Sequence, residues 1–168
     1  MPRTADLGLT TYWWVPGVAG IVNPLSPSAA ALTAAKNISQ YVVTSTSVNP
    51  TSSDTISEKG ITDTANASVP TVGNYEGTLV LFRDLAAGVP SVNDPLTTIG
   101  SVSGVVGWIV RRTGFTNLTA AAATQKVDLF LMMTDTPQKS GGTGDGYFKV
   151  TVPMLAQGVF GMEVALVA

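Results

Sequence analysis

The chain has 168 residues, which suits one domain with a sizeable core, and it contains no histidine, no cysteine and only 12% charged residues. Without histidine or cysteine, a serine–histidine–acid triad, a thiol nucleophile and the usual zinc sites are excluded. The formal net charge of −2 argues against binding nucleic acid through phosphate contacts, which requires a basic surface. We therefore expect no catalytic residues, no metal and no cofactor.

The low charge also bears on self-association. Soluble domains carry about 25% charged residues, and surface charge keeps copies of a protein apart. One interpretation is a neutral but soluble monomer; the favoured one is a surface largely covered in an oligomer, where interface cores are depleted of charge. No run of apolar residues is long enough for a membrane span, and no signal peptide is evident, so synthesis in a cytoplasm is expected.

Residues 1–36 are expected to form an extended assembly arm rather than part of the core. The aromatic cluster Tyr12, Trp13 and Trp14 is followed by prolines and glycines, beginning with Pro16, that interrupt regular elements. Adjacent residues of an extended segment point to opposite sides, so one of the two tryptophans must find cover elsewhere. This favours a contact between copies.

Residues 37–168 are expected to form a mainly β domain, a β-sandwich or barrel with one short flanking α-helix. Asp94 can cap a helix and Pro95 suits the first helical position, so that helix is expected to begin there. The alanine-rich residues 28–35, with Ser28 as a possible N-cap, permit one or two more helical turns. Strands are expected, in chain order, at residues 38–43, 55–61, 75–84, 105–112, 126–134, 147–152 and 160–167.

Two consecutive arginines end one of the predicted strands. Arg111 and Arg112 could form ion pairs with Asp84 or Asp94. Within a single copy, an ion pair on the surface contributes about 0.5 kcal/mol to the free energy of unfolding. Across a repeated interface between subunits, the same pair could instead fix the register of neighbouring copies.

Several short motifs resemble the major tail tube proteins of long-tailed (siphovirus-type) phages of actinobacteria. The stretch GLTTYWWVP, residues 8–16, resembles the start of that family, and so does the alanine–threonine segment that leads into residues 37–41, NISQY. The chain lacks the more charged loops that many relatives carry. The other matches, in the expected order, are the Tyr-Glu-Gly-x-Leu strand ending in Arg-Asp at residues 75–84, the small helix after Asp94 and the strand that ends in Arg111 and Arg112.

This resemblance implies a structural virion protein, not an enzyme, with a β-sandwich or barrel fold. In the family, six copies form a ring around a continuous inner β-barrel, and rings stack helically into a tube through which DNA passes without specific binding. The implied partners are further copies of the chain and the tape measure, tail terminator and distal tail proteins. The implied location is the virion tail, after synthesis in the bacterial host cytoplasm.

Two alternatives to a tail tube protein remain open from the sequence. One is another virion component, such as a head decoration or head–tail completion protein, and the other is a monomeric β-sandwich binding module. Low charge and a high content of predicted strand also fit the first of these alternatives.

The candidate site residues are structural rather than catalytic. Residues 62–73 are the expected ring-to-ring contact, because they exceed the usual hairpin connection of about 2–5 residues and carry one charge, and residues 44–54 are the competing segment. Asp128 and Glu163 lie inside apolar strands, and a carboxylate pair could do acid–base chemistry. We instead expect them on a solvent-facing or lumen-facing side, where acidic groups repel DNA. The assembly-interface candidates are Tyr12, Trp13, Trp14, Pro16, Thr62, Asp63, Val69, Pro70, Arg111 and Arg112.

Overall fold

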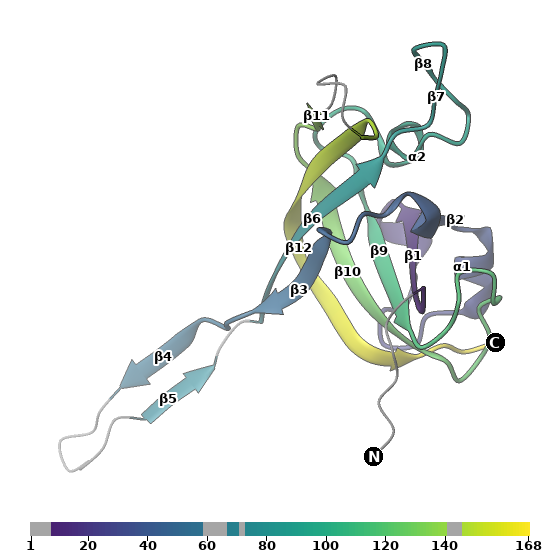
Figure 1. Ribbon diagram of the computed structural model, residues 1–168. Coiled ribbons are helices and arrows are strands. Elements are labelled where there is room, and N and C mark those ends of the chain that lie inside the picture. Colours follow the sequence, from purple (N-terminus) through teal and green to yellow (C-terminus); the bar gives the residue numbers. More distant parts are fainter. Residues whose placement is uncertain (1–7, 59–66, 71–72, 141–145) are drawn as a thin grey trace.

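An antiparallel sheet that curls around a hydrophobic core dominates the computed structural model, which describes residues 8–58, 67–70, 73–140 and 146–168 (Figure 1). Its strand order is β2-β1-β9-β10-β12-β6-β3, and β11 also pairs with β12. The expected mainly β fold is thus confirmed. The strands of this sheet are β1 (Thr10–Pro16), β2 (Lys36–Asn37), β3 (Ser47–Thr51), β6 (Asn74–Phe82), β9 (Val106–Thr113), β10 (Lys126–Thr134), β11 (Gln138–Ser140) and β12 (Lys149–Ala165).

Two small ribbons and several short helices complete the described chain. The ribbon β4 (Thr55–Glu58) and β5 (Ala67–Pro70) and the ribbon β7 (Leu85–Ala86) and β8 (Val89–Pro90) project from opposite ends of the domain (Figure 1). Two α-helices are present, the expected one after Asp94 and one within residues 28–35, where the sequence permits one or two turns. The Ser28 hydroxyl caps the latter by accepting from Ala31 N. The helices are α1 (Ala29–Ala34), α2 (Pro95–Ile99) and the 3-10 turns η1 (Val18–Gly20) and η2 (Ser39–Tyr41).

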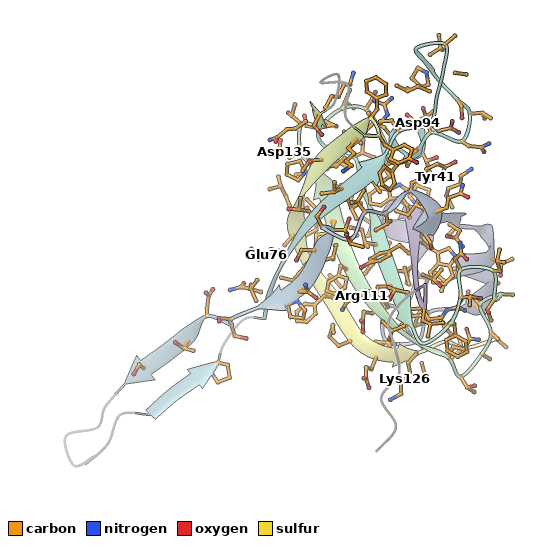
Figure 2. All side chains as sticks on the ribbon, in the orientation of Figure 1. Tyr41, Glu76, Asp94, Arg111, Lys126 and Asp135 are labelled. Carbon is orange, nitrogen blue, oxygen red and sulfur yellow. The ribbon has the colours of Figure 1, made fainter. Side chains whose placement is uncertain are left out.

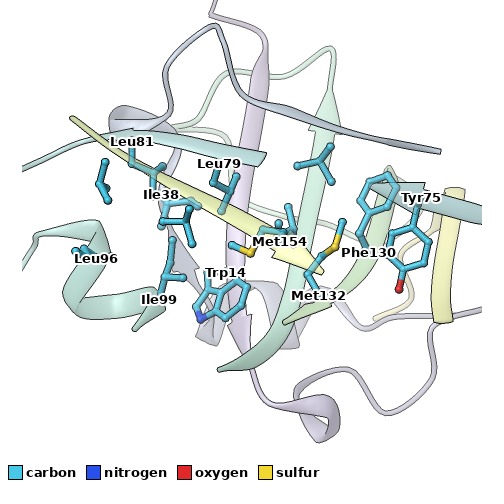
Figure 3. Close-up of a cluster of buried hydrophobic side chains, with 14 residues drawn as sticks. Trp14, Ile38, Tyr75, Leu79, Leu81, Leu96, Ile99, Phe130, Met132 and Met154 are labelled. Carbon is cyan, nitrogen blue, oxygen red and sulfur yellow. The ribbon is translucent and has the colours of Figure 1, made fainter. Parts of the chain in front are cut away.

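The main sheet is covered on both faces by parts of the same chain. Trp14 is completely buried in the cluster inside the curl, where Leu96 and Ile99 of α2 also lie (Figure 3). Trp13 points to the other face and is 4% exposed, in a second cluster that includes Leu32 of α1. The expectation that one tryptophan must be covered by another copy is therefore wrong, because each face has its own cover.

β1 is an interior strand of the sheet, not part of an arm. It pairs with β9 along its whole length and with β2 at Trp13 and Trp14. The proline and glycine residues that suggested an arm begin only at Pro16, where the strand ends, so they do not disturb its register. The expected arm of residues 1–36 is wrong for this segment, and residues 1–7 lie outside the described residues.

β12 is one strand of 17 residues where the sequence predicts two, residues 147–152 and 160–167. It pairs with β6 over residues 149–154 and with β10 over residues 154–165, so it joins the two halves of the sheet. Gly158, between the two expected strands, adopts a φ of 79° at an irregularity of the ladder, so the chain continues as one strand there.

Three further segments in the first half of the chain differ from expectation. Residues 39–41 form η2 instead of a strand, because the Asn37 side chain accepts from Ser39 N at 3.0 Å and from its hydroxyl at 2.6 Å and so favours a local turn. Residues 44–54, expected to form a loop that is in part extended, contain β3, whose five residues pair with β6. The expected loop at residues 62–73 contains β5, which pairs with β4.

Replacing Trp14 with Ala should destabilise the fold by about 3–5 kcal/mol, because it leaves a large cavity between the sheet and α2. The matched control is Leu118→Ala at a side chain that is 91% exposed, which should change the free energy of unfolding by less than about 0.5 kcal/mol. Denaturant titration gives both free energies of unfolding. Far-ultraviolet circular dichroism is the suitable probe, because the variant lacks one of the tryptophans that a fluorescence measurement would follow. Equal stability of the two variants would place Trp14 outside the core.

Candidate assembly surfaces

Arg111, labelled in Figure 2, connects three strands of the curled sheet. It extends from β9, donates through Nε and Nη2 to Asp128 of β10 at 3.1 and 2.9 Å, and donates through Nη1 to the carbonyl of Val48 in β3 at 2.9 Å. Both partners of this ion pair are largely buried, with side chains 16% and 13% exposed. The expected pairing of Arg111 with Asp84 or Asp94 is wrong, and the observed contacts hold the outer strand β3 against the far side of the curl.

Two side chains take the place of ladder hydrogen bonds where β12 bulges against β10. At the first irregularity the Tyr75 hydroxyl donates to Leu131 O at 2.6 Å and accepts from Gln157 N and Val159 N at 2.8 and 3.1 Å. At the second, Asp128 accepts from Glu163 N at 2.9 Å. These bonds fix the positions at which β12 bends.

Arg112 is a completely buried guanidinium that organises the loop after β9. It donates to the carbonyl oxygens of Thr116, Thr119 and Ala120 and to the side-chain oxygen of Gln125, at 2.7–3.2 Å. In the described chain its guanidinium pairs with no carboxylate, so the expected ion pair is wrong here too. Burial lowers the pKa of this guanidinium below its ordinary value, but arginine remains charged at neutral pH.

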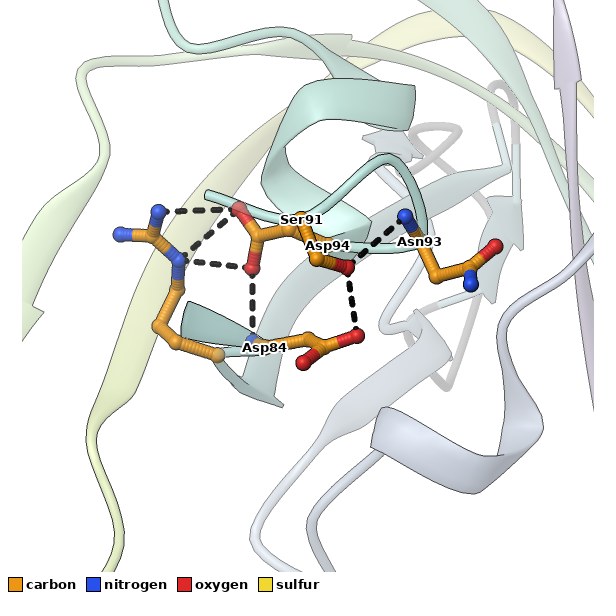
Figure 4. Close-up of polar contacts among 5 residues, drawn as sticks. Asp84, Ser91, Asn93 and Asp94 are labelled. Carbon is orange, nitrogen blue, oxygen red and sulfur yellow. Dashed lines mark hydrogen bonds and ion pairs between the residues drawn. The ribbon is translucent and has the colours of Figure 1, made fainter. Parts of the chain in front are cut away.

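The β7–β8 ribbon is anchored at its base by a second buried ion pair (Figure 4). Arg83 donates to both oxygens of Asp94 at 2.9 and 3.1 Å, and the two side chains are 8% and 0% exposed. Asp94 also accepts from Asp84 N, and Ser91 donates its hydroxyl to Asp84 at 2.6 Å. Because its carboxylate is engaged in this way, Asp94 precedes α2 without capping it through its side chain.

The expected interface residues do not gather into one surface. Tyr12 lies opposite Arg111 in the β1–β9 ladder. The Cζ atom of Arg112 lies 4.9 Å from the centre of the Trp13 ring. Both contacts are therefore internal to the chain. Pro16 is exposed at the end of β1. Val69 and the exposed Pro70 belong to β5 of the projecting ribbon, whereas Thr62 and Asp63 lie outside the described residues.

The two acidic candidates differ in environment. The charge of Asp128 is neutralised by Arg111 and is mostly buried. Glu163 is exposed and pairs with Lys126 at 3.1 Å, their side chains being 73% and 64% exposed. Glu163 also has a positive φ of 49°, which is uncommon for a residue with a side chain and coincides with the bulge at Asp128.

The described residues form no pocket with the side chains needed for small-molecule chemistry. A hollow of about 410 Å³ lies beside Lys126 and Glu163, and another of about 270 Å³ lies between Tyr41, Phe82 and Tyr147. Within the described ranges, no three acidic side chains gather closely enough to hold a metal ion, and no helix is long and apolar enough to cross a membrane. The remaining features are projecting ribbons, sheet edges and exposed apolar side chains.

Comparison with known proteins agrees with a structural role for these surfaces. The sequence matches the family described as "Phage tail tube protein" over residues 1–168. The chain belongs to the phage tail tube protein family. It is therefore a structural, non-enzymatic protein of the virion tail.

The fold of this tail tube protein is also found in a solved assembly. One similar chain is from the "Cryo-EM structure of the anti-feeding prophage (AFP) baseplate, 6-fold symmetrised", with 14% identity and a TM-score of 0.53. The match covers 96% of the tail tube protein and 97% of that chain, so it concerns the whole fold. A search of curated protein sequences gave no match.

Sequence reasoning missed the residues that shape the sheet of the tail tube protein. Tyr75 gave no signal beyond its place in a strand, since its hydroxyl acts on strands distant in the sequence. The glycine at Gly158 was a usable signal, because an isolated glycine in a strand pattern often marks a bulge.

Replacing Tyr75 with Phe should lower the free energy of unfolding by about 1–3 kcal/mol, because Leu131 O and two amides of β12 lose their partner. The matched control is Tyr147→Phe at a side chain that is 78% exposed, expected to change stability by less than about 0.5 kcal/mol. Chemical denaturation compares the two. A neutral Tyr75→Phe would show that the bulge does not need this hydroxyl.

Replacing Arg112 with Met should loosen residues 115–124, because three backbone carbonyls of that loop lose their donor. We expect faster proteolytic cleavage within the loop and a stability loss of about 1–3 kcal/mol. Lys126→Met, which breaks only an exposed ion pair, should cost less than about 1 kcal/mol and leave cleavage unchanged. Identical cleavage in both variants would contradict a role of Arg112 in ordering the loop.

Proposed function

We propose that six copies of this chain form a ring, and that rings stack head-to-tail into the tail tube of a long-tailed phage, through which DNA passes during ejection. The match to the phage tail tube protein family over the whole chain carries this proposal. The fold shared with a chain of a 6-fold symmetrised baseplate supports the ring number. The low content of charged residues supports close contact between copies.

The β4–β5 ribbon supports the stacking of rings. It projects from the domain, and among the described elements neither strand packs extensively on anything but the other (Figure 1). A lone two-stranded ribbon is marginally stable in water, so it needs a surface to lie on. We therefore assign the ring-to-ring contact to this ribbon, which includes Val69 and Pro70, and prefer it to residues 44–54, whose strand β3 is already held in the sheet.

The lumen would be lined by neutral and acidic groups. DNA slides past a surface that repels it, whereas a surface with excess lysine binds it. Glu163 fits a lumen-facing position because it is exposed. Asp128 does not, since its carboxylate is held by Arg111 and Glu163 N.

Further partners follow from the same proposal. A tube of fixed length needs proteins that begin, measure and end it, which in such phages are the distal tail, tape measure and tail terminator proteins. The two ends of a stack of head-to-tail rings present different surfaces, so different proteins can bind them.

Replacing residues 55–70 with a flexible Gly-Ser linker of equal length should leave the domain folded and prevent tube growth, leaving free rings or monomers. The equal length separates the loss of the ribbon from a change in chain connection. Thermal unfolding checks the fold, while analytical ultracentrifugation and negative-stain microscopy of the unaltered and altered proteins measure assembly.

Each outcome of this experiment bears on the proposal. Six-membered rings and tubes of the unaltered protein support it, and normal tubes of the altered protein move the ring-to-ring contact away from β4–β5. An unaltered protein that stays monomeric at high concentration contradicts the tube and favours a monomeric binding module. A closed shell or a single ring would favour a head decoration or head–tail completion protein.

A further inference from the structure

Three aromatic side chains from distant segments meet beside the base of the β7–β8 ribbon. Tyr41 ends η2, Phe82 ends β6, and Tyr147 lies two residues before β12. They surround the hollow of about 270 Å³, and Arg83 and Asp84 complete its lining. We call these five residues the aromatic hollow. A concave surface that is mostly apolar and aromatic, with a few convergent polar groups, is typical of ligand-binding sites.

The most exposed ring of the aromatic hollow is held in place by its neighbours. Tyr147 is 78% exposed, yet Phe82 meets it edge-to-face, with 5.3 Å between the ring centres and an interplanar angle of 73°. Lys149 in turn lies over Phe82, with Nζ 5.6 Å from the ring centre. Because these contacts orient the ring, Tyr147 presents a flat apolar face that loses little conformational entropy when a ligand binds.

The polar groups of the aromatic hollow are also fixed in position. Arg83 is held by Asp94, and the two side chains are 8% and 0% exposed. Nε and Nη2 of Arg83 donate to Asp94, whereas Nη1 has no partner among the described residues. Asp84 accepts from Ser91 through Oδ2 (Figure 4), and its Oδ1 has no partner in the part of the chain that the structure describes. The hollow therefore offers one donor group and one acceptor at defined places.

Charge around the aromatic hollow is balanced. The positive charges of Arg83 and Lys149 match the negative charges of Asp84 and Asp94. An anionic ligand would meet the carboxylate of Asp84, and a cationic ligand would meet the guanidinium of Arg83. A ligand that carries no charge, but both donates and accepts hydrogen bonds, avoids both repulsions.

We propose that the aromatic hollow binds one ring of a neutral sugar. The C–H groups on one face of a sugar can pack on Tyr147, while its hydroxyls accept from Nη1 of Arg83 and donate to Oδ1 of Asp84. Pockets for drug-sized ligands measure about 300–1,000 Å³, so this hollow suits a single ring. A purely apolar occupant, such as a proline of another protein, would leave both polar groups without partners, which weakens binding.

The aromatic hollow is suited to binding without reaction. Hydrolysis of a glycosidic bond generally requires two carboxyl groups that flank it. Asp84 is the only carboxylate that lines the hollow among the described residues, because Asp94 is completely buried and held by Arg83. The bound sugar would therefore remain intact. Its binding requires neither a ring nor a tube of copies.

The test measures the binding of methyl glycosides of glucose, galactose, mannose and N-acetylglucosamine to the full-length protein by saturation-transfer NMR. Tyr147→Ala should weaken the binding of the preferred sugar at least about 10-fold, because the sugar loses its stacking surface. The matched control, Phe148→Ala, removes a neighbouring aromatic side chain that is 55% exposed and does not line the hollow. It should change the affinity by less than about 2-fold. Circular dichroism should show both variants folded, since both side chains are exposed.

Charged and peptide probes test the class of ligand. The methyl glycoside of glucuronic acid should bind no more tightly than that of glucose, and binding tighter by more than about 3-fold would contradict a neutral ligand. The proposal is overturned if none of the sugars binds, or if the two variants weaken binding equally. Binding of a hexaproline peptide in place of the sugars also overturns it and assigns the hollow to a protein partner.

Oligosaccharides of the preferred sugar distinguish its source. Tighter binding than that of the methyl glycoside supports a sugar that is part of a polysaccharide, and equal binding supports a free sugar. The ring proposed above stands or falls independently of all these results, because none of them measures assembly.

Discussion

The two bends of β12 are the constraint on which the rest of the structure depends. Because the strand bends, its first half can pair with β6 and its second half with β10, and the sheet curls instead of lying flat. The curl encloses Trp14 on the inner face of the sheet. It leaves the outer face free for Trp13, which packs in a second cluster with Leu32 of α1. The bends themselves depend on Tyr75 and Asp128, two side chains that supply the hydrogen bonds a regular ladder would have made.

The buried charges of this protein fix strands and loops in place. Arg111 and Asp128 hold β3 to the curl, Arg83 and Asp94 hold the β7–β8 ribbon, and Arg112 holds a loop through carbonyl oxygens. Burying such groups is costly unless most of their donors and acceptors are engaged, which explains their many hydrogen bonds, although Nε of Arg112 has no hydrogen-bond partner among the described residues. The surface available for contact between copies is consequently even less charged than the composition indicates.

Local patterns predicted the local features well. The strands at β6, β9 and β10 follow directly from runs of β-branched and aromatic residues, and the cap at Ser28 follows from the preference of serine for that position. The missing strand at residues 39–41 has a local cause, the hydrogen bonds of the Asn37 side chain to Ser39, whereas the other failures concern contacts between distant segments. Whether Trp13 has its own cover, or which carboxylate Arg111 meets, depends on how the sheet curls, and no spacing in the sequence encodes that directly.

The opposite placement of the two ribbons gives the molecule a direction. In the stack proposed above, with all copies oriented alike along the line between the ribbons, one terminus would present β4–β5 and the other β7–β8, the two ribbons that lie at opposite ends of one chain in Figure 1. The two termini can then grow at different rates and can be blocked independently of each other. Polarity of this sort lets a filament start at a defined place and be stopped at the other end without any subunit in between being altered.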